Sequence, residues 1–362
     1  MSAIKLPALA VASMLLAVPL AAQVASQVAS QVPGTAAPAN SAVASALAGP
    51  PAPYVSPDTP QGGGPYPAIM QTAPGLPSHT LYRPVSLEAL GHIKLPVVVW
   101  GNGACINAGN RFRYFLTEIA SHGFLVLALG PIGPSEGEHA SSGSAIARPA
   151  PWVGSSAAKA LAAGQTLGSN LAGGSRPSDT SAQQMIDAID WAQALAQQGG
   201  ALGERVDPQA IAVMGQSCGG LQATAAAMDP RVKTLGVWNS GLFDDDSRQW
   251  AIADAKVTKA DLKGLKASAI YVTGDPSDVA FKNGEDDFAR VDQVPVFRAW
   301  REDTGHSGTY REYRGGAFAP VAVAWLQWQL KRDAQAARLF VGPRCGLCDD
   351  PRWHVKKKRI DP

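Results

Sequence analysis

Short, uninterrupted apolar runs recur along the chain and alternate with amphipathic helical segments. The runs at residues 95–103 (LPVVVWGNG) and 124–130 (FLVLALG) flank a helical pattern that ends at Gly123. Three further runs of this kind are AIAVMG, VKTLGVWN and ASAIYVTG, at residues 210–215, 232–239 and 267–274. Strands that are apolar on both faces need helices on both sides, and strands separated by helices pair in parallel. The sequence therefore predicts an α/β domain with a mostly parallel sheet.

Composition fits a globular domain without a nucleic-acid partner. The chain has 362 residues, 46% of them hydrophobic, which is enough to bury a sizeable core. Its formal net charge of +2 is too small to indicate nucleic-acid binding, and no basic stripe with interleaved aromatic residues occurs. The basic cluster at residues 356–359 is interpreted as a solvated C-terminal tail.

The N-terminus has the layout of a secretory signal peptide. Lys5 precedes an apolar run at residues 6–20, and small residues follow. The run is shorter than the roughly 20 apolar residues of a membrane span; an uncleaved anchor is the alternative. We therefore predict a signal peptide at residues 1–22, cleaved near Ala22, and a secreted or periplasmic protein with no stable membrane span after cleavage.

Residues 23–75 are rich in Ala, Pro, Gly and Ser, and they include the imperfect repeat QVASQVASQV. Such a composition cannot bury enough apolar surface to offset the entropy lost on ordering. We predict a disordered linker over residues 23–75 and a folded domain over residues 76–362.

The pentapeptide GQSCG at residues 215–219 follows one apolar run and precedes a series of small residues. A strand, G-x-S-x-G and a helix form a nucleophile elbow, in which a strained turn exposes the serine hydroxyl above the carboxyl edge of the sheet. The flanking glycines are required because side chains there would collide with the neighbouring strand and helix. Ser217 is therefore the candidate nucleophile; the alternative is an ordinary glycine-rich turn.

Serine needs a general base, which an acid holds in place. In this arrangement the acid and then the histidine follow the serine along the chain. Of the histidines, only His306 and His354 lie downstream of Ser217. His306 follows the apolar run VPVFRAW in a polar loop and is the candidate base. The sequence DPSD after the run at residues 267–274 offers Asp275 and Asp278 as the acid.

These residues resemble the α/β-hydrolase superfamily, in particular the branch of chlorophyllases, platelet-activating-factor acetylhydrolases and cutinase-like polyester hydrolases. EIASHGFLVLA (residues 118–128) is similar to the segment after the oxyanion loop in that branch, and SDVAF (residues 277–281) looks like the acid loop of the polyester hydrolases. The resemblance implies an α/β-hydrolase fold and a serine esterase activity. It implies that Asp278 is the acid, with Asp275 as the alternative.

Acyl transfer also needs donors for the oxyanion. One is expected to be the backbone N–H of Cys218, the residue after the nucleophile. The resemblance implies a second donor in the loop after the strand at 95–101, at Asn102 or alternatively Gly103. The chain departs from the family here, since Trp100 precedes Gly101 where the family often has histidine.

Trp238 ends the run after the elbow helix and is predicted to offer substrate an apolar surface. A position in the core is the alternative, because large aromatic side chains dominate buried cores.

The chain, which is predicted to be exported, has an even number of cysteines, and this favours disulfides. The four are Cys105, Cys218, Cys345 and Cys348. Cys345 and Cys348 are expected to form a local disulfide, because the sequence lacks further closely spaced zinc ligands and a thioredoxin-like context. Cys105 and Cys218 are hypothesised to form a disulfide that fixes the two donor amides. Two reduced cysteines packed as small apolar residues are the alternative.

These features predict a serine esterase that acts on a small-molecule or polymeric ester and needs no metal or organic cofactor. Two other functions stay open. The extended sequence GQSCGG also resembles the elbow of prolyl-oligopeptidase-like peptidases, but the residues upstream of 76 are too few for the propeller that those enzymes usually carry. A catalytically silent binding domain is the other alternative.

Overall fold

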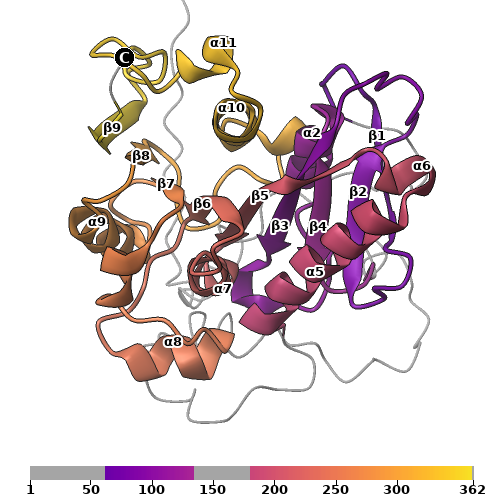
Figure 1. Ribbon diagram of the computed structural model, residues 1–362. Coiled ribbons are helices and arrows are strands. Elements are labelled where there is room, and N and C mark those ends of the chain that lie inside the picture. Colours follow the sequence, from indigo (N-terminus) through magenta and orange to yellow (C-terminus); the bar gives the residue numbers. More distant parts are fainter. Residues whose placement is uncertain (1–61, 134–179, 361–362) are drawn as a thin grey trace, which may run out of the picture. The chain divides into compact units, whose positions relative to one another are not determined.

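The computed structural model describes residues 62–133 and 180–360 (Figure 1). The predicted signal peptide at residues 1–22 and the predicted linker up to residue 61 lie outside the described residues.

Nine strands form a single sheet with the order β1-β2-β4-β3-β5-β6-β7-β8-β9. The strands are β1 (Ala68–Thr72), β2 (His79–Pro84), β3 (Leu95–Gly101), β4 (Leu125–Leu129), β5 (Val206–Gln216), β6 (Val232–Trp238), β7 (Ser268–Thr273), β8 (Val296–Arg301) and β9 (Trp353–Lys358). From β4 to β8 all neighbours in the sheet are parallel, whereas β1, β2 and β9 pair antiparallel at the two sides. The predicted α/β class with a mostly parallel sheet is confirmed.

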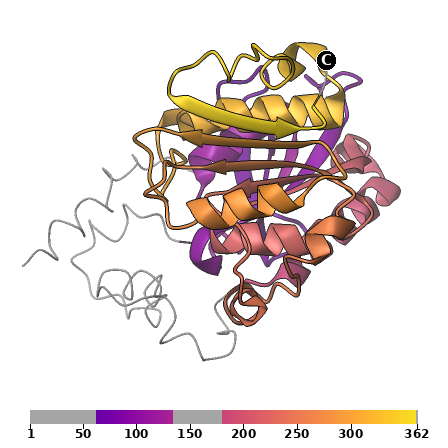
Figure 2. The same ribbon diagram turned by 90° about the vertical axis from the view of Figure 1, so that its left-hand side faces the viewer.

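Helices cover both faces of this sheet. The helices are α2 (Arg113–Ser121), α5 (Ala182–Gln198), α6 (Gly200–Gly203), α7 (Cys218–Ala226), α8 (Asp246–Ala253), α9 (Phe281–Arg290), α10 (Phe318–Lys331) and α11 (Ala334–Ala337), with short 3₁₀ turns η1 (Gly103–Cys105), η2 (Asp261–Gly264) and η3 (Tyr313–Gly315). Apolar side chains of α5, α7 and α9 belong to one core, and those of α2 and α10 belong to the other. Figure 2, viewed from the β9 side, shows α10 above the sheet and α7 and α9 below it.

Every residue of β3, β4 and β7 is buried, as expected of strands with helices on both faces. Helix α5 begins with a capping box. The side chain of Gln184 accepts a hydrogen bond from the backbone N–H of the N-cap residue Ser181. Helix α5 is followed by its C-cap residue Gly199, whose φ of 73° favours glycine.

The folded domain begins earlier than predicted. β1 lies upstream of residue 76 and pairs along its whole length with β2, and its residues Ala68 and Met70 are buried. The boundary at residue 76 is therefore wrong. A five-residue strand surrounded by Pro and Gly is stabilised by its partner strand, so local composition gave no sign of it.

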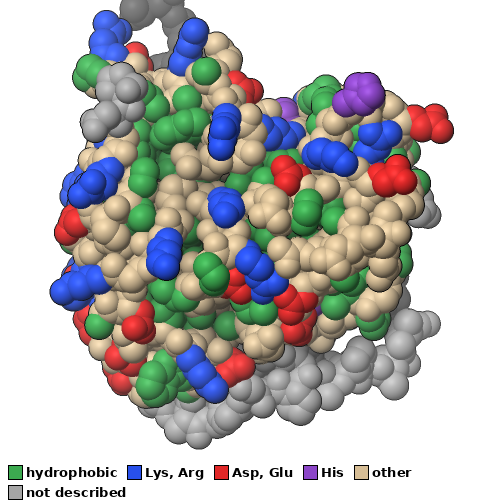
Figure 3. Space-filling model, in the orientation of Figure 1, with side chains coloured by type: hydrophobic (Ala, Val, Ile, Leu, Met, Phe, Trp, Pro, Cys, Tyr) green, Lys and Arg blue, Asp and Glu red, His purple; other side chains and the backbone are tan. Residues whose placement is uncertain are grey.

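The interpretation of residues 356–359 as a solvated tail is also wrong, because residues 353–358 form the edge strand β9. Trp353 is buried, while Lys356 and Lys358 are paired with Glu285 and Asp292. Lysines on an edge strand oppose edge-to-edge association of sheets. On the face shown in Figure 3, Lys and Arg side chains are dispersed among apolar and acidic ones.

In the part of the chain that the structure describes, no helix combines the length and the apolar content needed to cross a membrane.

Candidate active site

The candidate site lies where the order of the strands reverses. From β3 the chain passes to β4 on one side, and it then returns to β5 on the other side of β3. The loops that leave such neighbouring strands diverge, and in open α/β sheets ligands bind at this point of the carboxyl edge. Ser217 directly follows β5, and Asn102 directly follows β3. The topology thus brings together the predicted nucleophile and one predicted oxyanion donor.

Ser217 occupies the sharp turn between β5 and α7, with φ 53° and ψ −118°. A positive φ is uncommon for residues other than glycine, so the surroundings must hold the turn. The Ser217 N–H donates to the carbonyl oxygen of Trp238 (2.9 Å), and the Ser240 hydroxyl donates to the Ser217 carbonyl oxygen (2.6 Å). The strained turn predicted for the elbow is therefore present.

The two glycines that flank this turn are required by close backbone contacts. A Cβ atom at Gly215 would lie 2.1 Å from the carbonyl oxygen of Gly219. A Cβ atom at Gly219 would lie 2.1 Å from the carbonyl oxygen of Gly101 and 2.7 Å from the backbone nitrogen of Asn102. The start of α7 therefore packs directly on the end of β3, which only glycine permits.

His306 links Ser217 to Asp278. Its Nδ1 lies 2.7 Å from Asp278 Oδ1, and its Nε2 lies 2.9 Å from Ser217 Oγ. An ionised carboxylate only accepts hydrogen bonds, so Nδ1–H is the donor to Asp278 and Nε2 is left to accept from the serine hydroxyl. The side chain of His306 is 29% exposed, whereas that of Asp278 is completely buried. A hydroxyl next to a base, with that base oriented by an acid, is the arrangement that activates serine as a nucleophile.

The Asp278 carboxylate is held in its ionised form. Oδ1 also accepts from the N–H of Ala280 (2.9 Å), and Oδ2 accepts from the N–H of Gly274 (3.1 Å) and from Asn239 Nδ2 (2.7 Å). Burial alone would raise the pKa of Asp278. The hydrogen bond and charge of His306, with the donors of Ala280 and Asn239, outweigh this effect and lower the pKa below its usual value.

Asp275, the alternative acid, has a different position. Its carboxylate accepts from the N–H groups of Ser277 and Thr304, and its own N–H donates to the Thr304 carbonyl oxygen (2.7 Å). Asp275 therefore fastens the loop that carries His306, and the carboxylate that contacts His306 is that of Asp278.

Asn239 is a site residue whose contact with the acid the sequence did not reveal. It directly follows β6, is completely buried, and has a φ of 43°. Its Nδ2 donates to Asp278, and its Oδ1 accepts from the Tyr310 hydroxyl. A polar residue at the carboxyl end of an apolar run was the only signal of this role.

Gln216, the residue before the serine, was also missed. Its Nε2 donates to the carbonyl oxygen of His306 (3.0 Å), which connects the elbow with the histidine loop. A Cβ atom at Gly103 would lie 1.9 Å from Gln216 Oε1. The Gln216 side chain therefore packs against the loop that follows β3 as well.

Two backbone N–H groups near Ser217 are without an acceptor among the described residues. Within residues 62–133 and 180–360, neither Asn102 N–H nor Cys218 N–H donates to a protein acceptor. The Cys218 amide is the first of α7, where the helix dipole also favours negative charge. Both predicted donors are thus placed beside the elbow. Gly103, the alternative donor, is the next residue in the same turn.

The substrate-binding role predicted for Trp238 is wrong, because its side chain is completely buried. It packs against the rings of Phe115, Tyr310 and Phe318. Side chains alternate along β6, so Val237 faces the core under α7 and Trp238 faces the core under α2 and α10.

All four cysteines are paired at disulfide distance, Cys105 with Cys218 and Cys345 with Cys348. Both predicted pairings are therefore present. Among residues 62–133 and 180–360, no group of three or more His, Cys, Asp or Glu side chains is placed to hold a metal ion.

No protein-family model matches the sequence, and a search of curated proteins gives no significant match.

Proposed function

We propose that the chain is a serine hydrolase that cleaves carboxylic esters through an acyl-enzyme on Ser217. The observation that carries this proposal is the position of His306 between Ser217 Oγ (2.9 Å) and Asp278 Oδ1 (2.7 Å), with the serine in a strained turn. A strained turn and a partly buried polar chain of this kind would be costly to maintain in a protein that used its surface only for binding.

In the proposed reaction, His306 Nε2 takes the proton of Ser217 as the oxygen attacks the ester carbonyl. The tetrahedral oxyanion is stabilised by the N–H groups of Asn102 and Cys218. Asp278 stabilises the imidazolium, which then protonates the leaving alcohol. Water attacks the acyl-enzyme by the same route and releases the carboxylate.

We further propose that the domain belongs to the α/β-hydrolase superfamily, in the branch of chlorophyllases, platelet-activating-factor acetylhydrolases and cutinase-like polyester hydrolases. The strand–turn–helix context of Ser217 supports this assignment, as does the chain order of Ser217, Asp278 and His306. The resemblance to esterases and polyester hydrolases favours ester over peptide substrates. The two disulfides favour an oxidising compartment, in agreement with the predicted export.

The test is hydrolysis of short-chain p-nitrophenyl esters by the full chain and by Ser217→Ala. We expect the wild type to turn over and the variant to lose activity by roughly 10⁴-fold or more. Equal activity of the two proteins would contradict the assignment of the nucleophile.

A fluorophosphonate probe separates the alternatives, because only an activated serine reacts with it. Labelling at Ser217 together with peptide cleavage and no ester cleavage would favour a peptidase. A folded wild-type chain without labelling or turnover would favour a silent binding domain.

A further inference from the structure

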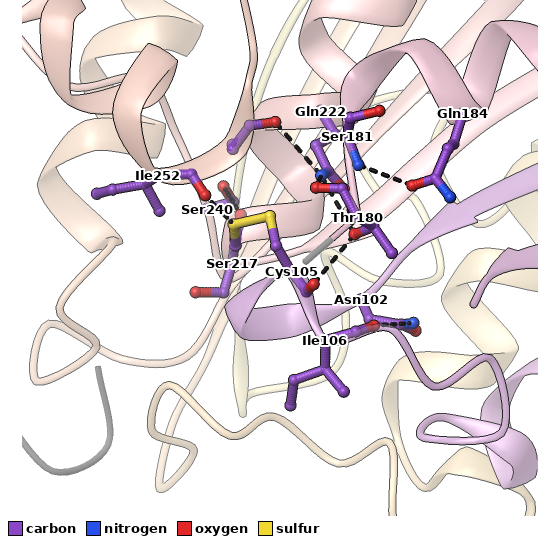
Figure 4. Close-up of a disulfide and its surroundings, with 12 residues drawn as sticks. Asn102, Cys105, Ile106, Thr180, Ser181, Gln184, Ser217, Gln222, Ser240 and Ile252 are labelled. Atoms are coloured by element: carbon purple, nitrogen blue, oxygen red, sulfur yellow. Dashed lines mark hydrogen bonds between the residues drawn. A yellow bond between two sulfur atoms is a disulfide. The ribbon is translucent and has the colours of Figure 1, made fainter. Parts of the chain in front are cut away.

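The Cys105–Cys218 disulfide joins the two segments that carry the candidate oxyanion donors. Cys218 supplies one donor through its own N–H, and Cys105 lies three residues after Asn102 in the turn η1. The bond connects positions 113 residues apart in the sequence, with Cα atoms 5.2 Å from each other. Figure 4 shows it beside Ser217. Within the described part of the chain, it is the one covalent cross-link between the loop after β3 and the start of α7.

The loop that carries Asn102 has a conformation that needs external support. Ala104 and Cys105 have consecutive positive φ values, 53° and 49°. Residues other than glycine adopt this region as isolated exceptions, and they keep it only where the surroundings fix them.

Hydrogen bonds from the side chain of Asn102 hold this loop in place. Asn102 Nδ2 lies within donating distance of the carbonyl oxygens of Ile106 (2.9 Å), Ala108 (3.1 Å) and Leu129 (2.7 Å). These contacts tie the loop to its own later turn and to the end of β4. None of these three contacts attaches the loop to the turn that carries Ser217.

A second set of hydrogen bonds holds the backbone of Cys105. The N–H and the hydroxyl of Thr180 donate to the Cys105 carbonyl oxygen (2.9 and 3.2 Å). Gln222 of α7 donates in turn to the Thr180 carbonyl oxygen (2.8 Å). The Cys105–Cys218 disulfide is almost completely buried, and Cys218 is the residue directly after Ser217.

We propose, on the basis of the proposed function, that the Cys105–Cys218 disulfide is a positioning element of the oxyanion hole. It fixes the N–H groups of Asn102 and Cys218 relative to each other, so that the chain reaches its full rate only in the oxidised form. In the activating step, the two thiols lose two protons and two electrons to a disulfide oxidant. The new S–S bond forms, and the oxidant is released as two thiols.

The proposal predicts a specific kinetic effect. Preorganised donors stabilise the transition state more than bound substrate, so their loosening lowers kcat and leaves KM nearly unchanged. A boronic acid that forms a tetrahedral adduct with Ser217 places an oxygen at the same donors. Its affinity is therefore expected to fall in parallel with kcat.

The test compares Cys105→Ala/Cys218→Ala with the matched control Cys345→Ala/Cys348→Ala, both in the full chain. We measure kcat and KM for p-nitrophenyl butyrate and the inhibition constant of phenylboronic acid. For the first variant we expect kcat and boronate affinity each to fall by about 10- to 100-fold, with KM within about threefold of the wild type. The control is expected to retain wild-type values.

The Cys105–Cys218 disulfide closes a long loop and therefore also stabilises the fold. The assays are for this reason run well below the melting temperature of each variant. A folded Cys105→Ala/Cys218→Ala chain with wild-type kcat and boronate affinity would overturn the proposal. So would a change confined to KM.

If this variant does not fold, the remaining disulfide is reduced with a phosphine in the Cys345→Ala/Cys348→Ala background. The phosphine becomes its oxide with oxygen from water, and two thiols form. We expect kcat to fall on reduction and to recover with oxidised glutathione, and full activity in the reduced chain would overturn the proposal. A wild-type chain without ester turnover or fluorophosphonate labelling would instead overturn the proposed function.

Discussion

The side-chain amide of Asn239 donates a hydrogen bond to Asp278 Oδ2 over 2.7 Å, between residues that follow different strands of the sheet. The Tyr310 hydroxyl donates to Asn239 Oδ1, and this fixes which end of the amide faces the carboxylate. Asn239 thus orients the acid that orients His306. It acts on the proposed reaction through Asp278, without contact with the nucleophile.

We expect Asn239→Leu to lower kcat by about 10- to 100-fold, because a hydrogen bond to a charged group contributes about 1.5 to 3 kcal/mol. Asn239 lowers the pKa of Asp278, so its loss raises that pKa. The loss of kcat/KM that protonation of Asp278 causes on the acid side should therefore begin at higher pH. The measurement is a pH profile of ester hydrolysis, with circular dichroism to verify folding.

Tyr310→Phe is the matched control for this prediction, since it keeps the Asn239–Asp278 bond and removes the hydroxyl that orients the amide. Its effect on kcat should be smaller than that of Asn239→Leu. An unchanged pH profile in a folded Asn239→Leu chain would contradict the positioning role.

A second prediction concerns the contact between Gly103 and Gln216. Gly103→Ala would place a methyl group 1.9 Å from Gln216 Oε1, so the glutamine must move and its bond to the His306 carbonyl oxygen must break or weaken. We expect a fall in kcat of roughly tenfold, about the value of one hydrogen bond.

A double-mutant cycle tests this contact. Gln216→Ala alone should lower kcat by a similar factor, and Gly103→Ala should have little further effect when combined with it. Multiplicative effects of the two substitutions would show that they act independently, contrary to this prediction.

The parts of the fold that the sequence predicted are those with a continuous apolar pattern. β3, β4 and β7 are buried throughout, so their sequences alone indicate strands between two helical layers. β1, β2 and β9 contain polar or basic residues and are stabilised by antiparallel partners. Their formation depends on tertiary pairing, which a local pattern does not encode.

The residues of the candidate site likewise fall into those that the sequence predicted and those that it did not. Ser217, Asp278 and His306 are predictable because each has a local motif and a fixed order along the chain. Asn239 and Gln216 act on partners 39 and 90 residues away, so their roles depend on how the loops meet. The prediction for Trp238 was wrong because an aromatic residue at the end of a strand can pack in the core as readily as it can border a cleft.

The third prediction concerns the backbone contact between the start of α7 and the end of β3. Gly219→Ala places a Cβ atom 2.1 Å from the Gly101 carbonyl oxygen, and backbone cannot move away as a flexible side chain can. We expect the free energy of unfolding to fall by about 1 to 3 kcal/mol, the usual cost of overpacking, together with a loss of ester hydrolysis. Urea denaturation measures the first effect.

Gly264→Ala is the matched control, because nothing lies within 4 Å of a Cβ atom at this position. It should leave both stability and activity close to wild type. A Gly219→Ala chain with wild-type stability would show that the elbow and β3 can separate without cost.

The last prediction concerns Asp287 of α9, a completely buried carboxylate outside the proposed site. It accepts the N–H of Leu242 (2.8 Å), and its other oxygen lies 3.7 Å from Lys259 Nζ. Burial raises the pKa of Asp287 to about 7, in spite of the bond from Leu242 and the charge of Lys259. In the unfolded chain this carboxyl group has an ordinary pKa near 4.

Between these two pH values the folded chain holds a proton that the unfolded chain has lost. The contribution of Asp287 to the free energy of unfolding is therefore complete below about pH 4 and decreases as the pH rises toward 7. Asp287→Asn keeps an acceptor for Leu242 and cannot ionise. We expect it to be more stable than wild type at pH 8, by roughly 2 to 4 kcal/mol, and close to wild type at pH 4. Urea denaturation at the two pH values measures the difference, and a stability gain that is the same at both would contradict the raised pKa.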